Sequence, residues 1–199
     1  MPAGFLIALE GIDGAGKTTQ ARLLVNWLRE KGFDARYTYE PTRGPFGRIL
    51  RSMAHSRDVD PRLEALLFAA DRLHHLMCVI SPLLERGLII VSDRYLHSSL
   101  AYQSVTTGDQ RWVEEINKFA RRPDLGIYLD VSASGGLNRL ARRRKRSRFE
   151  DEDFLERVRE KYLEYVERGE LVKVDAGRPV DDVFSEITSI VENALRGRR

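Results

Sequence analysis

The chain has 199 residues, of which 42% are hydrophobic and 32% are charged, a composition that excludes an intrinsically disordered protein. The 33 basic and 30 acidic residues leave a net charge of only +3, which argues against a dedicated nucleic-acid-binding protein. No apolar run is long enough to span a membrane, and no signal-peptide pattern is present. We therefore expect one cytoplasmic domain over residues 1–199 that binds neither a membrane nor a nucleic acid.

Short apolar runs alternate with longer amphipathic segments along the chain. The run "FLIALE" at 5–10 predicts a buried strand, and "KTTQARLLVNWLREKG" after it has apolar residues at helical spacing before Gly32 ends the pattern. Further strands are predicted at 35–40, 88–93, 124–130 and 170–176. Helices are predicted at 61–87, with an interruption near Ser81-Pro82, at 153–169 and at 180–197.

This alternation predicts an α/β fold with three layers, in which helices cover both faces of a five-stranded parallel sheet. Ligands of such sheets bind at the carboxyl ends of the strands. The single cysteine, Cys78, lies in the apolar stretch "LMCVI", and we expect it to be a buried structural thiol.

The segment "GIDGAGKTT" follows the first predicted strand and satisfies the P-loop pattern G-x-x-x-x-G-K-[ST]. In such a loop, backbone N–H groups and a helix N-terminus surround phosphate oxygens. The lysine then neutralises the β- and γ-phosphates, and the following hydroxyl binds Mg²⁺. The predicted ATP phosphate-binding residues are Gly11, Ile12, Asp13, Gly14, Ala15, Gly16, Lys17, Thr18 and Thr19.

A second part of a nucleotide site is predicted at the end of the strand at 88–93. Asp93 stands where a Walker-B acid reaches the metal, so Thr18 and Asp93 are the predicted metal residues. Arg94 follows directly, and a structural salt bridge is the competing interpretation of this Asp-Arg pair. The chain has no N-K-x-D motif, which excludes an ordinary GTPase.

A run of basic residues, "RRRKRSR" at 142–148, is the most charged segment of the chain. Such runs are typical of nucleic-acid patches. They also occur as solvated surfaces or as sites for the phosphates of small molecules. The run alone leaves these three interpretations open.

Taken in order, the segments "LEGIDGAGKTTQ", "YEPTRG", "LLFAADR", "SDRYLHSSLAYQ", "RPDLGIYLDV", "SRFE" and "VDAGRPVDDV" resemble the thymidylate kinases, which are P-loop nucleoside-monophosphate kinases. The resemblance implies Mg²⁺-dependent transfer of the ATP γ-phosphoryl group to dTMP, giving dTDP and ADP for deoxynucleotide biosynthesis, in a homodimer. A broader pyrimidine monophosphate kinase acting on dUMP, UMP or dCMP is the alternative. A P-loop switch or a nucleic-acid-associated ATPase is the alternative of a different class.

The resemblance also implies roles for single residues on the acceptor side. Phe68 would stack on thymine and Arg72 would donate to a thymine carbonyl, while Asp13 would accept from the sugar 3′-hydroxyl. Arg43 and Arg94 would bind the acceptor phosphate, and Tyr102 would crowd the ribose 2′ position. Pro41 would follow a cis peptide bond, and Ser99 would lie near the base in a role that stays open. On the donor side, Ala176, Gly177 and Arg178 would form an adenine-binding loop.

Some thymidylate kinases carry an arginine after the P-loop acid, where this chain has Gly14. Relatives without that arginine place basic residues in a lid, which implies that residues 142–150 form an Arg-rich lid. The lid candidates are Arg142, Arg143, Arg144, Arg146 and Arg148. Arg148 is the preferred catalytic one beside Lys17 and Arg94, with Arg144 and Arg146 as alternatives. The apolar stretch 63–80 is a candidate dimer face, although burial in the core explains it equally.

Overall fold

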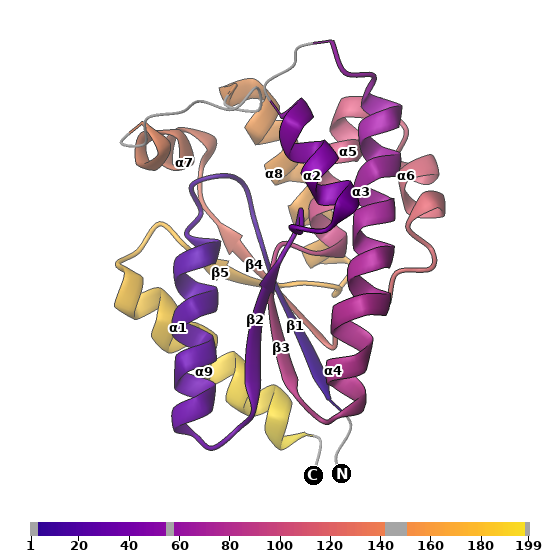
Figure 1. The fold of residues 1–199 in the computed structure, drawn as a ribbon. Coiled ribbons are helices and arrows are strands. Elements are labelled where there is room, and N and C mark those ends of the chain that lie inside the picture. The colour runs from indigo at the N-terminus through magenta and orange to yellow at the C-terminus, as the bar shows by residue number, and fades with distance from the viewer. Residues whose placement is uncertain (1–3, 55–57, 142–150, 198–199) are drawn as a thin grey trace.

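The computed structural model describes residues 4–54, 58–141 and 151–197. Its centre is a five-stranded sheet in which each strand pairs in parallel with its neighbours, in the order β2-β3-β1-β4-β5 (Figure 1). The strands are β1 (Phe5–Glu10), β2 (Ala35–Tyr39), β3 (Ile89–Asp93), β4 (Leu125–Asp130) and β5 (Val172–Asp175). All five predicted strands are therefore confirmed, with ends that shift by one or two residues.

Helices cover both faces of this sheet, as predicted. Helices α1 (Lys17–Glu30) and α9 (Val180–Arg196) pack together on one face. On the other face, α4 (Ser81–Glu85) and α8 (Glu152–Glu167) contact the strands, and α3 (Pro61–His75) and α5 (Leu96–Thr107) pack beside them. The other described helices are α2 (Pro45–Met53), α6 (Gln110–Ile116) and α7 (Ala133–Leu140).

The central strand β1 is buried along its whole length because it has neighbours on both edges and helices on both faces. This explains why "FLIALE" reads as a continuous apolar run rather than an alternating one. Leu6, Ile7 and Leu9 are each 0% exposed. At about 1.5–3 kcal/mol per buried aliphatic side chain, these three residues anchor the strand whose end leads into the P-loop.

Residues 61–85 form one helical path, and its irregular segment lies before Ser81-Pro82, where the interruption was predicted. The π-helical segment η1 (Leu76–Ile80) joins α3 to α4, and Pro82 lies in the first turn of α4, where proline is tolerated. Only Leu76 and Ile80 of "LMCVI" are buried, and Cys78 is exposed. The expectation of a buried thiol is wrong, because the middle of this turn faces away from the core.

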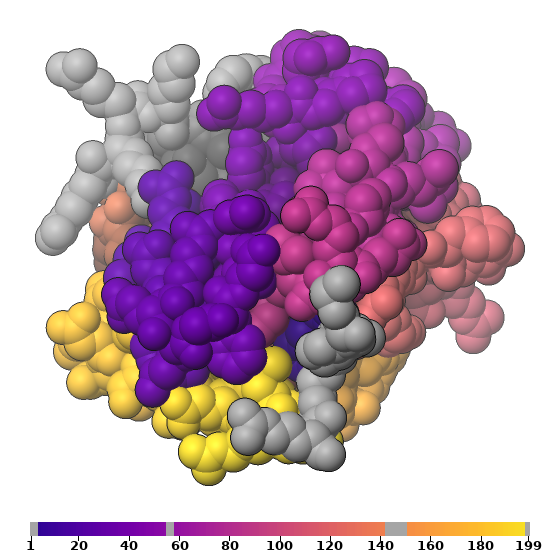
Figure 2. All heavy atoms as spheres, turned by 60° about the horizontal axis from the view of Figure 1, so that its bottom comes forward, coloured from indigo at the N-terminus to yellow at the C-terminus, as the bar shows by residue number. Residues whose placement is uncertain are grey.

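Strand β1 begins and helix α9 ends at the amino ends of the strands (Figure 1). Figure 2 turns this end forward and shows the indigo atoms of the α1 region beside the yellow atoms of α9. Among the described residues, no helix combines the length and the apolar character needed to cross a membrane. The cavities described next lie at the carboxyl ends of the strands.

Candidate active site

The P-loop connects β1 to α1 and needs glycine for two reasons: a positive φ angle, and close approach of another part of the backbone. Gly11, Gly14 and Gly16 have φ angles of 146°, 84° and 93°, in the region that L side chains rarely adopt. At Gly14 there is also no room, because a Cβ atom would lie 2.2 Å from the carbonyl oxygen of Gly136 in α7. The loop backbone and α7 thus touch directly.

Lys17 begins α1 and is only 6% exposed. Its Nζ donates to the carbonyl oxygens of Gly11 (2.9 Å) and Ile12 (2.8 Å), so the ammonium group lies inside the loop. Burial, assisted by the positive charge of Arg94, lowers the pKa of Lys17 to about 8. A phosphate entering the loop would replace these carbonyls as the partner of the ammonium group.

Thr18 and Asp93 come together although they lie on different elements. Thr18 Oγ1 donates to Asp93 Oδ2 at 2.5 Å, and the Tyr37 hydroxyl approaches the same oxygen at 3.3 Å. A hydroxyl and a carboxylate are hard oxygen ligands of the kind that Mg²⁺ prefers, together with phosphate oxygens and water. The two predicted metal residues therefore fit the ion.

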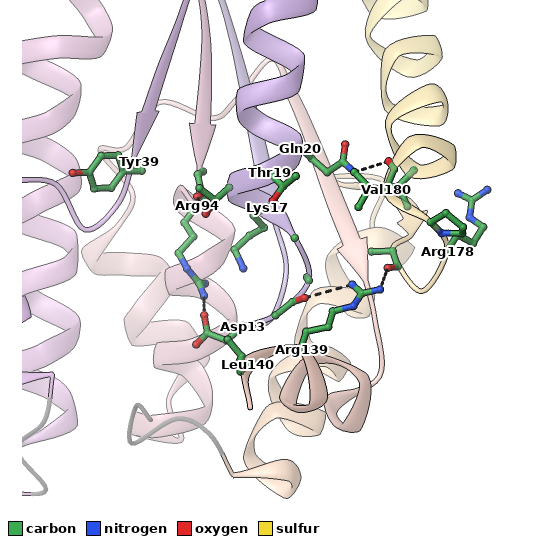
Figure 3. Close-up of a pocket in the computed structure, with 18 of the residues that line it drawn as sticks. Asp13, Lys17, Thr19, Gln20, Tyr39, Arg94, Arg139, Leu140, Arg178 and Val180 are labelled. Carbon is green, nitrogen blue, oxygen red and sulfur yellow. Dashed lines mark hydrogen bonds and ion pairs between the residues drawn. The ribbon is translucent and has the colours of Figure 1, made fainter. Parts of the chain in front are cut away.

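A cavity of about 510 Å³ opens above the P-loop (Figure 3). Residues 13–19 of the loop line it on one side, and Ala176 and Arg178 of the predicted adenine loop line it on the other, with Gly177 between them in sequence. Arg139 of α7 joins the two sides, since its Nη1 and Nη2 lie 3.5 Å from the Gly14 oxygen and 2.8 Å from the Ala176 oxygen. The volume lies within the range of small-molecule sites in proteins, and the lining by loop backbone, Lys17 and arginines suits the phosphates of a nucleotide.

A second cavity of about 200 Å³ lies beside the first, between α2, α3 and α5. Seven of the eight residues with predicted acceptor roles line it: Asp13, Pro41, Phe68, Arg72, Arg94, Ser99 and Tyr102. The Glu40-Pro41 peptide bond is cis, as the resemblance implies. The half-buried ring of Phe68 and the 1%-exposed guanidinium of Arg72 thus face one enclosed space.

Asp13, Glu40 and Arg94 line both cavities. Arg94 Nη2 lies 2.5 Å from Asp13 Oδ1, and its guanidinium carbon lies 4.9 Å from the centre of the Tyr102 ring. Arg94 is also the one non-glycine residue with positive φ (68°) in the described part of the chain. Backbone strain of this kind is typical of functional residues. The competing structural salt bridge is present, but it is made with Asp13 rather than with the neighbouring Asp93.

The Tyr102 hydroxyl accepts a hydrogen bond from the Asp13 backbone N–H at 3.0 Å. Burial, together with the nearby Asp13 carboxylate, raises the pKa of Tyr102, so its phenol stays protonated. Tyr102 thus links α5 to the P-loop through Asp13, which lines both cavities.

Two residues on the acceptor side differ from the sequence-based expectation. Arg43 is exposed and lines a third, shallower hollow with Thr42 and His74, not the acceptor cavity. Arg51 lines the acceptor cavity instead, and it donates to the carbonyl oxygens of Pro41 (3.0 Å) and Thr42. No carboxylate pairs with Arg51 among the described residues. Sequence reasoning missed Arg51, Glu40 and Arg139. Glu40 lies in the segment "YEPTRG", which could have drawn attention to it, whereas none of the segments that resemble the family includes Arg51 or Arg139.

The predicted lid arginines, Arg142, Arg143, Arg144, Arg146 and Arg148, lie outside the described residues. The preference for Arg148 therefore stays a prediction. Arg139 and Leu140, which stand just before Ala141 at the end of this described segment, both line the larger cavity.

A P-loop with its buried lysine, an acid at the end of β3 and a second cavity joined to the first through Arg94 define a nucleotide phosphotransferase, namely a nucleoside-monophosphate kinase. Comparison with known proteins specifies the class further. The family described as thymidylate kinase matches residues 9–187, and the chain belongs to this family.

Among its relatives is a protein from Staphylothermus marinus named "Probable thymidylate kinase", with 48% identity over 94% of each chain. A protein of the same name from Pyrococcus abyssi is 41% identical over 98% of both chains. Another, from Methanocaldococcus jannaschii, is 39% identical over 97% of this chain and 98% of its own.

Proposed function

We propose that the protein transfers the γ-phosphoryl group of ATP to dTMP, with Mg²⁺. The observation that carries this proposal is the meeting of two cavities, one built on a P-loop and one lined by Phe68 and Arg72, at Asp13 and Arg94. Family membership supports the same reaction. ATP would occupy the larger cavity and dTMP the smaller one.

The donor phosphates would lie against the P-loop amides, with the Lys17 ammonium group on the β- and γ-phosphates. Thr18 and Asp93 would hold the Mg²⁺ ion, directly and through water. Bound there, the ion neutralises charge on the phosphate oxygens. Among the described residues, no cluster of three or more His, Cys, Asp or Glu side chains could hold a metal. A magnesium site completed by substrate phosphates needs none.

The reaction needs no general base, because the nucleophile is an ionised phosphate oxygen of dTMP. What the protein must supply is the in-line approach of two polyanions and cations around the transferred group. Arg94 lies between the two cavities and can contact both phosphates. We assign Arg51 to the acceptor phosphate as well, since it lines the smaller cavity and pairs with no carboxylate in the part of the chain that the structure describes. Arg43 remains a weaker candidate for that role, and the lid arginine, preferably Arg148, would complete the set.

The nucleoside would lie deeper in the smaller cavity. Phe68 offers a ring for stacking, and Arg72 offers a donor to a base carbonyl. The Tyr102 ring would crowd a ribose 2′-hydroxyl, and Asp13 would accept from the 3′-hydroxyl. Ser99 would lie near the base.

An acceptor panel tests the proposed function. Initial rates with ATP and Mg²⁺ on dTMP, dUMP, UMP and dCMP should show the highest kcat/KM on dTMP. A preference for UMP or dCMP would favour the broader pyrimidine kinase instead. ATP hydrolysis stimulated by DNA or RNA, without transfer to any nucleotide, would favour the nucleic-acid-associated ATPase.

We further propose a homodimer formed through α3 and η1. Leu63, Leu66, Leu73 and Met77 are between 39% and 65% exposed, and their spacing places them along one side of the helical path. Exposed apolar side chains at this spacing are costly in a monomer, and the same segment in a second copy would cover them. Light scattering after gel filtration should give a dimer for the wild type and a monomer for Leu66→Glu, whereas a monomeric wild type would refute the proposal.

A further inference from the structure

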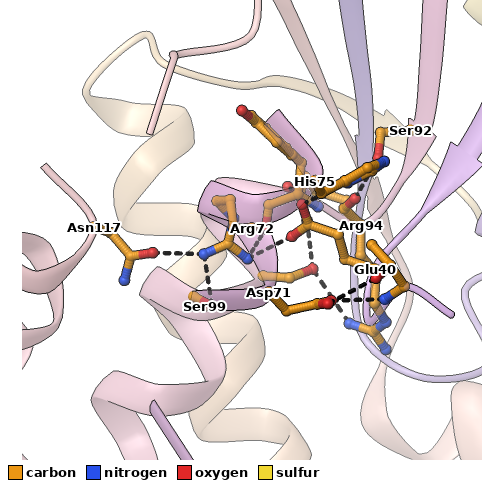
Figure 4. Close-up of polar contacts among 12 residues, drawn as sticks. Glu40, Asp71, Arg72, His75, Ser92, Arg94, Ser99 and Asn117 are labelled. Carbon is orange, nitrogen blue, oxygen red and sulfur yellow. Dashed lines mark hydrogen bonds and ion pairs between the residues drawn. The ribbon is translucent and has the colours of Figure 1, made fainter. Parts of the chain in front are cut away.

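Arg72 lies at the end of a chain of polar contacts that begins on the edge strand β2 (Figure 4). Thr38 Oγ1 lies 2.6 Å from His75 Nε2, and His75 Nδ1 lies 3.0 Å from Glu40 Oε1. The other carboxylate oxygen, Glu40 Oε2, accepts from Arg72 Nη2 at 2.7 Å. Glu40, Arg72 and His75 are 5%, 1% and 2% exposed, so solvent does not weaken these contacts.

The guanidinium of Arg72 is held by the protein at both terminal nitrogens. Nη1 donates to Ser99 Oγ (3.0 Å) and Asn117 Oδ1 (2.6 Å), while Nη2 donates to Glu40 and to the Tyr95 carbonyl oxygen (3.0 Å). A guanidinium has five N–H groups, and these contacts use four of them.

The fifth group, Nε–H, is buried and has no partner among the described residues, although the side chain lines the acceptor cavity. The plane of the guanidinium is thus fixed before any ligand arrives. One donor remains for a ligand.

We propose that His75 is a positioning residue for recognition of the acceptor base. Through Glu40 it fixes Arg72, so that the unpartnered Nε–H of Arg72 meets a carbonyl oxygen of the pyrimidine. The proposal rests on the proposed function, since it assigns the base of dTMP to the smaller cavity.

The argument depends on how Glu40 is held. Its two carboxylate oxygens have one partner each on α3, and these partners are three residues apart on the same helix. Without the imidazole, Oε1 would lose its partner and the carboxylate could rotate away from Arg72. Glutamine at position 75 could replace both contacts, because its amide nitrogen can donate to Glu40 and its amide oxygen can accept from Thr38.

The test is calorimetric binding of dTMP, without catalysis, to the full chain and to three variants. His75→Ala should weaken dTMP binding by about tenfold, the scale of one buried hydrogen bond to a charged group. His75→Gln should lie within about threefold of the wild type by the same scale. His74→Ala, at the half-buried neighbouring position, is the matched control and should leave dTMP binding unchanged.

Two further ligands separate positioning from general loss of structure. ATP binding should be unchanged in all three variants. Deoxyribose 5-phosphate, which has no base, should inhibit the wild type and His75→Ala with equal inhibition constants. If His75→Ala does not fold, Thr38→Val removes the other end of the chain of contacts and should weaken dTMP binding by roughly threefold.

Unchanged dTMP binding by the folded His75→Ala variant, or by Thr38→Val in its place, would overturn the positioning role. Equal weakening of dTMP, ATP and deoxyribose 5-phosphate would also overturn it, in favour of a purely structural role. A wild type that does not bind dTMP at all would refute the proposed function, and this inference with it.

Discussion

Replacement of Arg94 tests both the chemistry and the backbone strain of the site. Arg94→Ala and Arg94→Gly remove the same guanidinium, which lies 2.5 Å from Asp13 and faces both cavities. We expect kcat to fall by about 10²–10³ in both variants, the scale for loss of one group that stabilises charge in the transition state. The KM for ATP should change much less, because the P-loop contacts remain.

The two variants should differ in stability. With φ at 68°, a residue with a Cβ atom pays about 1–2 kcal/mol in the left-handed region. Glycine avoids this cost but loses about 0.5–1 kcal/mol through the freedom of the unfolded chain. The net expectation is a glycine variant more stable than the alanine variant by up to about 1 kcal/mol. For a chain of this size, that corresponds to a Tm roughly 2–4 °C higher.

A coupled assay for ADP release gives kcat, and thermal unfolding without nucleotides gives Tm. An unchanged kcat in either variant would refute the catalytic role of Arg94. An alanine variant as stable as the glycine variant, or more stable, would refute the argument from strain. Arg94→Lys is the control for charge, and it should recover only part of kcat because it keeps the charge and loses the planar fork.

Three other predictions concern the two cavities. ATP should bind the charged form of Lys17. Because burial lowers the pKa of Lys17 to about 8, the protonated fraction of this lysine should fall from about 0.9 at pH 7 to about 0.1 at pH 9. Calorimetry without Mg²⁺ should show the ATP Kd rising about tenfold over this range, and a constant Kd would contradict the buried ammonium group. Phe68→Ala should raise the KM for dTMP by about tenfold or more, the scale of one base–aromatic stack, with little change in the KM for ATP. An equal rise in both KM values would mean that Phe68 only packs in the protein core. Arg51→Ala should raise the KM for dTMP by about tenfold and Arg43→Ala by less than threefold, and the reverse order would restore Arg43 as the phosphate ligand.

The sequence predicts the fold and the donor side because their determinants are local. The P-loop is nine consecutive residues, of which six lie between β1 and α1 and three form the start of α1, and Asp93 is placed by the end of its own strand. Parallel strands bring their carboxyl ends to one edge, so Thr18 and Asp93 meet although 75 positions separate them. Their contact needs no knowledge of side-chain packing.

The acceptor side is less predictable because its residues meet through packing of helices. Arg43 and Arg51 lie eight residues apart, and the packing of α2 against α3 brings Arg51 to the cavity while Arg43, before the helix, lies outside it. His75 is the second of two adjacent histidines at the end of α3, and nothing in the neighbouring sequence signals its contact with Glu40. The exposure of Cys78 depends likewise on the π-helical turn, which hydrophobicity alone does not indicate.

The contact between the P-loop and α7 gives a physical reason for the distribution of arginines in this chain. A Cβ atom on Gly14 would lie 2.2 Å from the Gly136 oxygen, and one on Gly136 would lie 2.6 Å from the Asp13 oxygen. An arginine at position 14 would therefore force α7 away from the loop. Within the described residues, α7 itself brings a cation to the donor cavity, because Arg139 lies 3.5 Å from the Gly14 oxygen and 2.8 Å from the Ala176 oxygen. The lid role of the basic run at 142–148 stays a prediction from the sequence, since these residues lie outside the described ones.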